Sequence, residues 1–445
     1  MVVGCSNIVI YIVAFIAAIL ILVFFHELGH FLVARWAGVR VLTFSIGFGP
    51  KLCSFKDRLG TEYQLAAIPI GGYVRMLGED EFAEQPRSED AAAAFCNAHP
   101  SRKVAIAAAG PFASLLLGFI IFYIVLVSGT RELDPFLGTI SPDSPAHVAG
   151  LRTGEEVLQV DQVEVSSWQA INLALAERLG DSGEIAILTN RSSYSIPIHA
   201  WLSKESEPDM LSALGIAPQF RAHIAEIVDG SAAEQAGLRV GDHISQIDGS
   251  PVANWQEVVA TIRANAERAL LLQVDREDET VQLSLVPRLI TDSEGESYGQ
   301  AGIRPQIGRF VRYGPLEAIP AAFDRTVNLI VISADSIVKI VTGEVHSSNL
   351  GGPIRIAEYA GDLASLGLEP FLMLLAALTI ALGLINLLPI PMLDGGHVVF
   401  GIIEGITRKP IPMKVQAIGL RVGLFIVGFI MLFALYNDIS RLVSQ

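Results

Sequence analysis

Charged residues are scarce in this sequence. They make up 17% of its 445 residues, against 51% hydrophobic residues, whereas a soluble domain usually carries about a quarter charged residues. This deficit argues against an ordinary soluble protein. The apolar residues gather in four long runs, at 8–25, 104–127, 371–388 and 415–436. Each run approaches the roughly 20 residues that cross a hydrocarbon core, so the sequence predicts four transmembrane helices.

Cysteine is also scarce. The chain has only Cys5, Cys53 and Cys96, which excludes a disulfide framework. The first apolar run has no basic segment before it and no small-residue cleavage site after it, unlike a secretory signal peptide. We therefore expect the first run to be retained as a membrane span.

Basic residues are few between residues 129 and 350, where 31 acidic residues outnumber 16 basic ones. Such an acidic region repels phosphate backbones, so no nucleic-acid partner is expected. Lysine and arginine gather instead in the loop between the first two spans and in the loop between the last two. By the positive-inside rule, both loops should be cytoplasmic, with the termini and the middle region on the outside.

The middle region contains an internal repeat with an offset of 87 residues. Matched pairs include Ser144 with Ser231, Gly154 with Gly241 and Trp168 with Trp255. Both copies resemble PDZ domains, most clearly in AGLRVGDHISQIDGSPV of the second copy, whereas the first copy replaces its Gly-Asp step with Gly-Glu-Glu. PDZ-like modules bind peptides by strand addition. A rigid spacer is the alternative.

The strongest chemical signal is the sequence VFFHELGHFLVA. It places His26 and His30 four residues apart, on one face of a helix, with Glu27 beside them. Two imidazoles at this spacing can hold one zinc ion, and the carboxylate can take a proton from water bound to it. Ionisable groups at the end of an apolar span cost about 2.5 to 3.5 kcal/mol each and usually mark function. The position therefore favours a metal site over a solvated helix face.

A catalytic zinc needs a third protein ligand, and the segment NLLPIPMLDGGHVVF offers Asp394 and His397. Pro389 and Pro391 cannot continue a helix, so the third span should end before them. Non-helical backbone at membrane depth is tolerated where it lines a wet cavity. Asp394 is expected at the edge of that cavity, before a flexible Gly395-Gly396 pair. Spacing alone leaves Asp394 and His397 both open.

These motifs together resemble the site-2 protease family (peptidase M50) of intramembrane zinc metalloproteases. The likeness rests on HELGH, NLLPIPMLDGG and the tandem repeats, and it extends through FSIGFGP, GTEYQLAAIPIGGYVRML, NLGGPIRIA and LYNDISRL. It implies that His26, His30 and Asp394 bind the zinc, that His397 does not, and that Glu27 is the base. It also implies that Asn386 holds the substrate backbone.

Strand patterns at 63–68 and 73–77 flank Gly71 and Gly72. They predict a β-hairpin beside the membrane, which the family resemblance describes as membrane-reentrant. An ordinary cytoplasmic hairpin is the alternative. An unwound substrate would bind to its edge by strand addition. The expected substrate-binding residues are Asn386, Gly71, Gly72, Tyr73 and Pro391.

One position departs from the family pattern. The second span of the family usually carries Gly-Pro-x-x-Asn, whereas this chain has Ser114 after Gly110-Pro111. Ser114 keeps a hydroxyl group but lacks the amide. The sequence leaves open whether this position orients another residue.

The predicted fold is a polytopic α-helical membrane protein with four transmembrane helices, a membrane-associated β-hairpin and two tandem PDZ-like α+β domains. The first two spans, with the hairpin, are expected at 1–128, and the last two at 367–445. The PDZ-like domains are expected at 129–215 and 216–308. An amphipathic stretch within 309–366 should lie on the outer membrane surface.

The predicted function is zinc-dependent hydrolysis of peptide bonds within or near the transmembrane segments of single-span proteins, in the bacterial inner membrane. The resemblance implies two kinds of substrate: an anti-sigma factor already cut outside the membrane, as part of stress signalling, and remnant signal peptides. One alternative is a membrane-anchored peptide-binding scaffold with a structural zinc. Another is a transporter, suggested by the proline-broken span.

Overall fold

A computed structural model of the chain describes residues 5–79, 91–205, 208–277, 279–291, 296–306, 308–349 and 351–444. Part of the first basic loop (80–90) and Leu350 lie outside these described residues. The chain divides into two compact units. The first unit comprises Met1–Ser128, Arg312–Val338 and Ser347–Gln445, and the second comprises Gly129–Val311 and Lys339–His346.

Four helices of the first unit are long and apolar enough to cross a membrane, as predicted from the four apolar runs. They are α1 (Cys5–Trp36), α2 (Pro100–Ser128), α10 (Leu368–Asn386) and α12 (Met413–Ser444). α1 continues through HELGH, and its candidate span runs from Val9 to Trp36. At about 1.5 Å per residue, His26 lies roughly 26 Å along the helix from Val9. HELGH therefore lies in the C-terminal half of the candidate span.

α2 packs against α1, α10 and α11 (Asp394–Thr407), and glycines allow the close approach. A Cβ atom at Gly29 would lie 2.4 Å from the carbonyl oxygen of Ala109, and one at Gly118 would lie 2.5 Å from Ile380 Cγ1. Since real side chains do not tolerate such distances, glycine is needed where α1 and α10 cross α2. Several apolar residues of α2 are almost fully buried, among them Ile121, Val125 and Leu126.

The predicted flexibility of Gly395 and Gly396 is wrong. Both glycines lie in the first turn of α11, a helix that the sequence pattern did not predict. A Cβ atom at Gly395 would lie 2.2 Å from the carbonyl oxygen of Leu388, and one at Gly396 would lie 2.4 Å from that of Ile390. The glycines therefore allow tight packing of the helix start against the turn that ends the third span.

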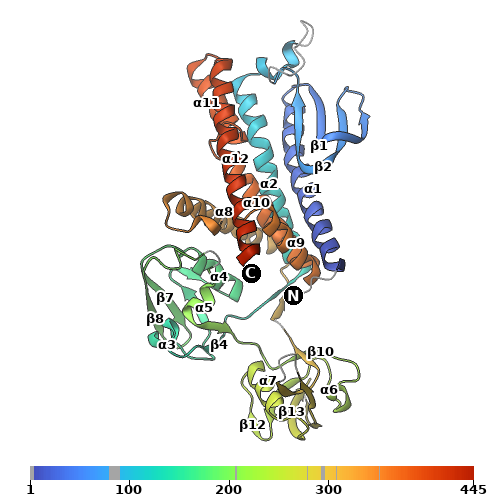
Figure 1. Cartoon of the computed structure of the whole chain (residues 1–445), viewed down its shortest axis with the longest axis vertical. Helices are drawn as coiled ribbons and strands as arrows, with labels where there is room; N and C mark the ends of the chain where they lie inside the picture. Colours follow the sequence, from blue (N-terminus) through green and yellow to red (C-terminus); the bar gives the residue numbers. More distant parts are fainter. Residues whose placement is uncertain are drawn as a thin grey trace. The chain divides into compact units, whose positions relative to one another are not determined.

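The predicted strands beside Gly71 and Gly72 both belong to β2 (Glu62–Met76), which pairs with β1 (Val41–Lys56). Phe44 of β1 is opposite both Tyr63 and Val74, so the first half of β1 lies between the two halves of β2. The predicted strands thus pair with β1 rather than with each other. In the register of the described residues, 72–76 pair on one side only, and this edge segment belongs to the sheet that lies beside α1 (Figure 1).

Two further helices follow the main segment of the second unit in the chain. α8 (Ala318–Thr342) covers most of the stretch expected to be amphipathic. Its Ala318 and Ala322 are fully buried against the core of the membrane helices, whereas Phe323 is exposed. α9 (Pro353–Leu366) packs against α1, α10 and α12.

A buried carboxylate connects α12 to the start of α9. Asp438 of α12 is only 2% exposed and accepts hydrogen bonds from the backbone N–H groups of Gly352, Ile354 and Arg355, at 2.9, 2.9 and 3.2 Å. The first N–H groups of a helix have no partner within the helix. Asp438 supplies that partner from the neighbouring helix.

The second unit contains two lobes (Figure 1). Both lobes begin with the order strand, helix, two strands, helix, two strands, and they differ after it. The first lobe comprises β4 (Leu137–Ile140), α3 (Pro145–Ala149), β5 (Val157–Val160), β6 (Val163–Glu164), α4 (Trp168–Ala176), β7 (Gly183–Thr189), β8 (Ser193–Ile198), α5 (Met210–Leu214) and β9 (Ile216–Pro218). The second comprises β10 (Ile224–Ile227), α6 (Ala232–Gln235), β11 (His243–Ile247), β12 (Ser250–Pro251), α7 (Trp255–Ala264), β13 (Leu270–Arg276), β14 (Glu279–Leu285), β15 (Arg288–Thr291), β16 (Ser297–Gln300) and β17 (Ile303–Pro305).

The two lobes have matching sheets. A four-stranded sheet has the order β6-β5-β7-β8 in the first lobe and β12-β11-β13-β14 in the second, and β4 pairs with β9 as β10 pairs with β17. The bounds of β7 and β13 differ by the 87 residues of the sequence repeat. Outside the lobes, β3 (Thr130–Glu132) pairs with β18 (Arg309–Val311), which brings together the two ends of the unit's main segment.

Candidate metal centre

Three polar side chains from two distant parts of the chain meet in the first unit. Nε2 of His26 lies 3.1 Å from Oδ2 of Asp394, Nε2 of His30 lies 3.4 Å from the same oxygen, and the two Nε2 atoms are 3.3 Å apart. Both histidines are at most 9% exposed. Among the described residues, these three form the only group of histidine, cysteine and acidic side chains with metal-binding spacing.

The separations of these three atoms fit a zinc ion. With bonds of about 2.0 to 2.1 Å in tetrahedral geometry, two ligand atoms stand roughly 3.3 Å apart. Two imidazoles and one carboxylate are a donor set that zinc accepts, with a fourth position left for water or substrate. Asp394 is also the first residue of α11, where the positive end of the helix dipole stabilises a carboxylate.

The opposite ring nitrogens of both histidines are held by α2. Nδ1 of His30 lies 2.8 Å from the carbonyl oxygen of Ile106, and Nδ1 of His26 lies 3.0 Å from Oγ of Ser114. Gly110 lies between these two positions, and a Cβ atom there would be 2.1 Å from Nε2 of His30. α2 therefore orients both imidazoles from behind and leaves room for the His30 ring.

Glu27 lines the same cavity as the three candidate ligands, a space of about 320 Å³. The edge segment of β2 lies against it, because a Cβ atom at Gly72 would be 3.0 Å from Cγ of Glu27 and 2.7 Å from Cγ1 of Val23. β2 thus approaches, at Gly72, the carboxylate that could serve as a base.

The sequence-predicted substrate-binding residues have different positions. Gly72, Tyr73 and Asn386 line the cavity. Gly71 lies within β2 with a φ of 91°, packed against Phe48. Pro391 is not among the described residues that line the cavity, and a Cβ atom at Gly419 would lie 3.1 Å from its Cβ.

The cavity has further lining residues, one of which the sequence offered as an alternative ligand. His397 lines the cavity but is not one of the three clustered side chains. Met76, Glu79, Phe95 and Met392 also line it, and no motif singles them out. The contact of Ser114 with His26 depends on how α1 and α2 align, which spacing along the chain does not reveal.

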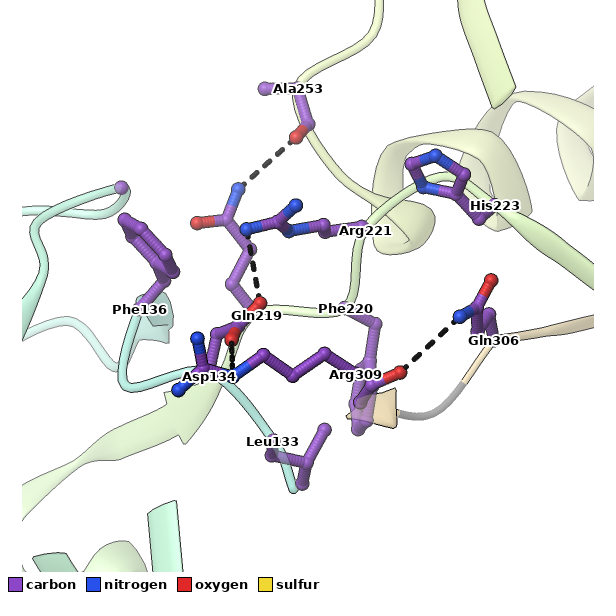
Figure 2. Close-up of a pocket in the computed structure, with 12 residues that line it drawn as sticks. Leu133, Asp134, Phe136, Gln219, Phe220, Arg221, His223, Ala253, Gln306 and Arg309 are labelled. Atoms are coloured by element: carbon purple, nitrogen blue, oxygen red, sulfur yellow. Dashed lines mark hydrogen bonds and ion pairs between the residues drawn. The ribbon is translucent and has the colours of Figure 1, made fainter. Parts of the chain in front are cut away.

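A larger cavity, of about 410 Å³, lies in the second unit. Figure 2 shows Arg221 and Arg309 both reaching Asp134, at 3.0 and 3.1 Å. His223 also lines this cavity, and burial is the main reason that its pKa lies below the ordinary value, with the charges of His243 and Arg221 acting in the same direction. Its arginines pair with Asp134, and the described residues that line it contain no group of side chains with metal-binding spacing, so this cavity is a weaker candidate for catalysis.

Comparison with known proteins gives the family of the chain. Residues 14–430 match Peptidase family M50. Protease RseP of Yersinia pestis and regulator of sigma-E protease RseP of Escherichia coli (strain K12) are each 38% identical over 444 residues, covering 96% of this chain and 98% of theirs. A Vibrio cholerae protein named as a zinc metalloprotease is 35% identical, covering 97% of this chain and 98% of its own.

A smaller part of the chain is similar to a solved structure. The PDZ domain of the SdrC-like protein from Listeria innocua matches 20% of this chain and 97% of its own length, with 19% identity and a TM-score of 0.17. The whole-chain matches are far more extensive and agree with the family predicted from the motifs. The chain belongs to peptidase family M50 and is a zinc metalloprotease.

Proposed function

We propose that the chain is an intramembrane endopeptidase that cleaves single-span membrane proteins within or near their transmembrane segments. The observation that carries this proposal is the cluster of His26, His30 and Asp394. Its three ligand atoms stand 3.1 to 3.4 Å apart, and both histidines lie within a candidate membrane span. A site at this depth has access to peptide bonds that soluble proteases cannot reach.

The three side chains would hold the zinc ion, and Glu27 would be the general base. When bound, zinc lowers the pKa of a coordinated water and polarises the scissile carbonyl. Glu27 would take the proton of the attacking water and pass it to the leaving amine. The position of Glu27 in the same cavity as the ligands supports this role.

The substrate would bind as an extended strand. A transmembrane helix hides its carbonyl groups in its own hydrogen bonds, so it must unwind before cleavage. The edge of β2 at 72–76 can pair with such a segment by strand addition. Tyr73 and Asn386 line the cavity beside this edge and are proposed to hold the substrate backbone, with Gly71, Gly72 and Pro391 shaping the site.

The substrates are proposed from the relatives. Because several are named regulator of sigma-E protease, we propose an anti-sigma factor already cut on the outer side, and remnant signal peptides, as substrates in the inner membrane of a bacterium. The two lobes are proposed to be tandem PDZ-like domains in the periplasm that contact peptides or control access. The active site would lie toward the cytoplasm.

Replacing the base tests the proposed function. The Glu27→Gln variant should keep one zinc per chain but lose cleavage of a single-span reporter by at least 100-fold, since proton transfer by a positioned base contributes about 10² to 10⁴. Zinc content by mass spectrometry and reporter cleavage in proteoliposomes give both quantities for the same preparation.

Glu62→Gln is the matched control, because Glu62 lies on β2 and pairs with Lys51 rather than lining the cavity. It should cleave at the wild-type rate. Cleavage that survives in Glu27→Gln would contradict the proposed role of Glu27. A wild-type chain that holds zinc but cleaves no membrane substrate would instead support the peptide-binding scaffold.

A further inference from the structure

We propose that Ser114 is the positioning residue for His26: its hydroxyl oxygen accepts the Nδ1 proton and so directs Nε2 toward the metal. The proposal rests on the proposed metal site. It assigns a role to the one position at which the sequence departs from the family pattern of Gly-Pro-x-x-Asn.

The first step is the geometry of α2. Ile106, Gly110 and Ser114 follow one another at intervals of four residues, which places them on one face of the helix. This face offers His30 a carbonyl oxygen at 2.8 Å, leaves space for the ring at the glycine, and offers His26 a hydroxyl oxygen at 3.0 Å. Each imidazole thus has one partner for Nδ1 while its Nε2 remains directed at Asp394.

The second step is the tautomer. A neutral imidazole carries one proton, and a nitrogen that binds a metal must be free of it. If Nε2 is the ligand, Nδ1 carries the proton and must donate it to a neighbour. Ser114 Oγ is the atom within hydrogen-bond distance of Nδ1 of His26.

The third step is that Ser114 is itself fixed. It is 0% exposed, and its carbonyl oxygen accepts a hydrogen bond of 3.2 Å from the hydroxyl group of Thr379 on α10. A short side chain suffices because α1 and α2 lie so close that a Cβ atom at Gly29 would be 2.6 Å from that of Ala113. The hydroxyl group therefore reaches His26 without the longer amide side chain.

Loss of such a partner typically weakens metal affinity by about 10- to 100-fold. Because a neutral hydroxyl is a modest acceptor, we expect Ser114→Ala to weaken zinc binding about 10-fold. We also expect a changed absorption spectrum when cobalt replaces zinc, because the His26 ring is no longer held in one orientation.

The experiment uses the full chain in detergent micelles, stripped of metal and titrated with zinc against a chromophoric chelator. Cobalt spectra and the melting temperature of the metal-free protein are recorded in parallel. Thr379→Val is the matched control, since it removes a hydrogen bond to the same residue but leaves Oγ and His26 in contact. Ser114→Asn tests whether the amide side chain of the family pattern supports zinc binding as well as the hydroxyl group does.

The expected result is weaker zinc binding and an altered cobalt spectrum for Ser114→Ala, with wild-type affinity for Thr379→Val. Equal affinity and spectra for Ser114→Ala and wild type would overturn the role of Ser114 alone. Equal weakening in both variants would also overturn it, because the effect would then come from helix packing. A wild-type chain that binds no zinc would overturn the proposed metal site as well.

Discussion

Glu155 and Asp242 occupy equivalent positions in the two lobes, 87 residues apart, and both are almost fully buried. Asp242 forms an ion pair with Arg276, whose Nε lies 2.8 Å from one carboxylate oxygen. Burial raises the pKa of Asp242, but the hydrogen bonds and charge of Arg276 outweigh it and leave the pKa below its usual value. At the position equivalent to Arg276 the first lobe has Thr189, and Glu155 accepts hydrogen bonds from the hydroxyl groups of Thr189 and Tyr194, both at 2.9 Å.

The two acids should therefore respond differently to neutralisation. Asp242→Asn leaves the Arg276 guanidinium without its counter-charge and should destabilise the second lobe by about 3 kcal/mol. The partners of Glu155 are neutral hydroxyl groups that can reorient around an amide. Glu155→Gln should therefore destabilise the first lobe by less than about 1 kcal/mol. Hydrogen-exchange mass spectrometry on the full chain measures both lobes separately. An equal loss of protection in the two variants would contradict this account.

At the residue scale, local periodicity was enough to predict that His26, Glu27 and His30 lie together. The partnership of Asp394 with the two histidines joins positions 368 residues apart in the chain, and spacing alone left His397 as a rival. The contact between Ser114 and His26 could not be predicted, because it depends on how two helices align. Physical rules for helices fix which residues share a face, but not which face meets which neighbour.

At the scale of elements, the segment of β2 around Gly72 lies against Glu27, the proposed base. A Cβ atom at Gly72 would lie 2.7 Å from the carbonyl oxygen of Ser45 and 3.0 Å from Cγ of Glu27. Gly72→Ala should therefore push the strand edge away from its position and lower the cleavage rate by about 10- to 100-fold, since a shift of about 1 Å at a reacting site can cost 10²-fold. Zinc content should not change.

Cleavage of the single-span reporter tests the prediction, with Gly428→Ala as control because a Cβ atom there meets nothing within 4 Å. The control should cleave at the wild-type rate. If Gly72→Ala cleaves as fast as the control, the edge of β2 does not determine how the substrate is held.

The contact between α12 and α9 leads to a second prediction for the elements. Asp438 accepts three backbone hydrogen bonds at the start of α9. Asp438→Asn replaces one accepting oxygen with a donor and should destabilise this junction by about 1.5 to 3 kcal/mol. The measurement is hydrogen exchange in the first turn of α9. Asp362→Asn is the control, since its bond to Tyr11 is exposed, and similar exchange in both variants would contradict the assigned role.

The sequence predicted correctly those elements whose bounds depend only on residues within one segment. Pro389 and Pro391 correctly indicated that the third span ends before them, as α10 ends at Asn386. α11 was missed because Gly395 and Gly396 suggest flexibility in a sequence, whereas here they allow close packing. The pairing of β2 with β1 was also missed, since strand patterns do not identify their partners.

For the whole molecule, composition and the apolar runs predicted the four candidate membrane helices, and the 87-residue repeat predicted two similar lobes. The two motifs NLGGPIRIA and LYNDISRL are far apart in the sequence but meet at Asp438. No feature of either motif predicts that contact, because it follows from the packing of α9 against α12.

The central claim is that His26, His30 and Asp394 hold one metal ion, and zinc stoichiometry of the full chain tests it most directly. Wild type and His397→Ala should each retain one zinc per chain after dialysis against a weak chelator. Asp394→Ala should lose it, because two histidines alone provide too few ligands for a stable site. Retention of zinc in Asp394→Ala together with its loss in His397→Ala would contradict the account.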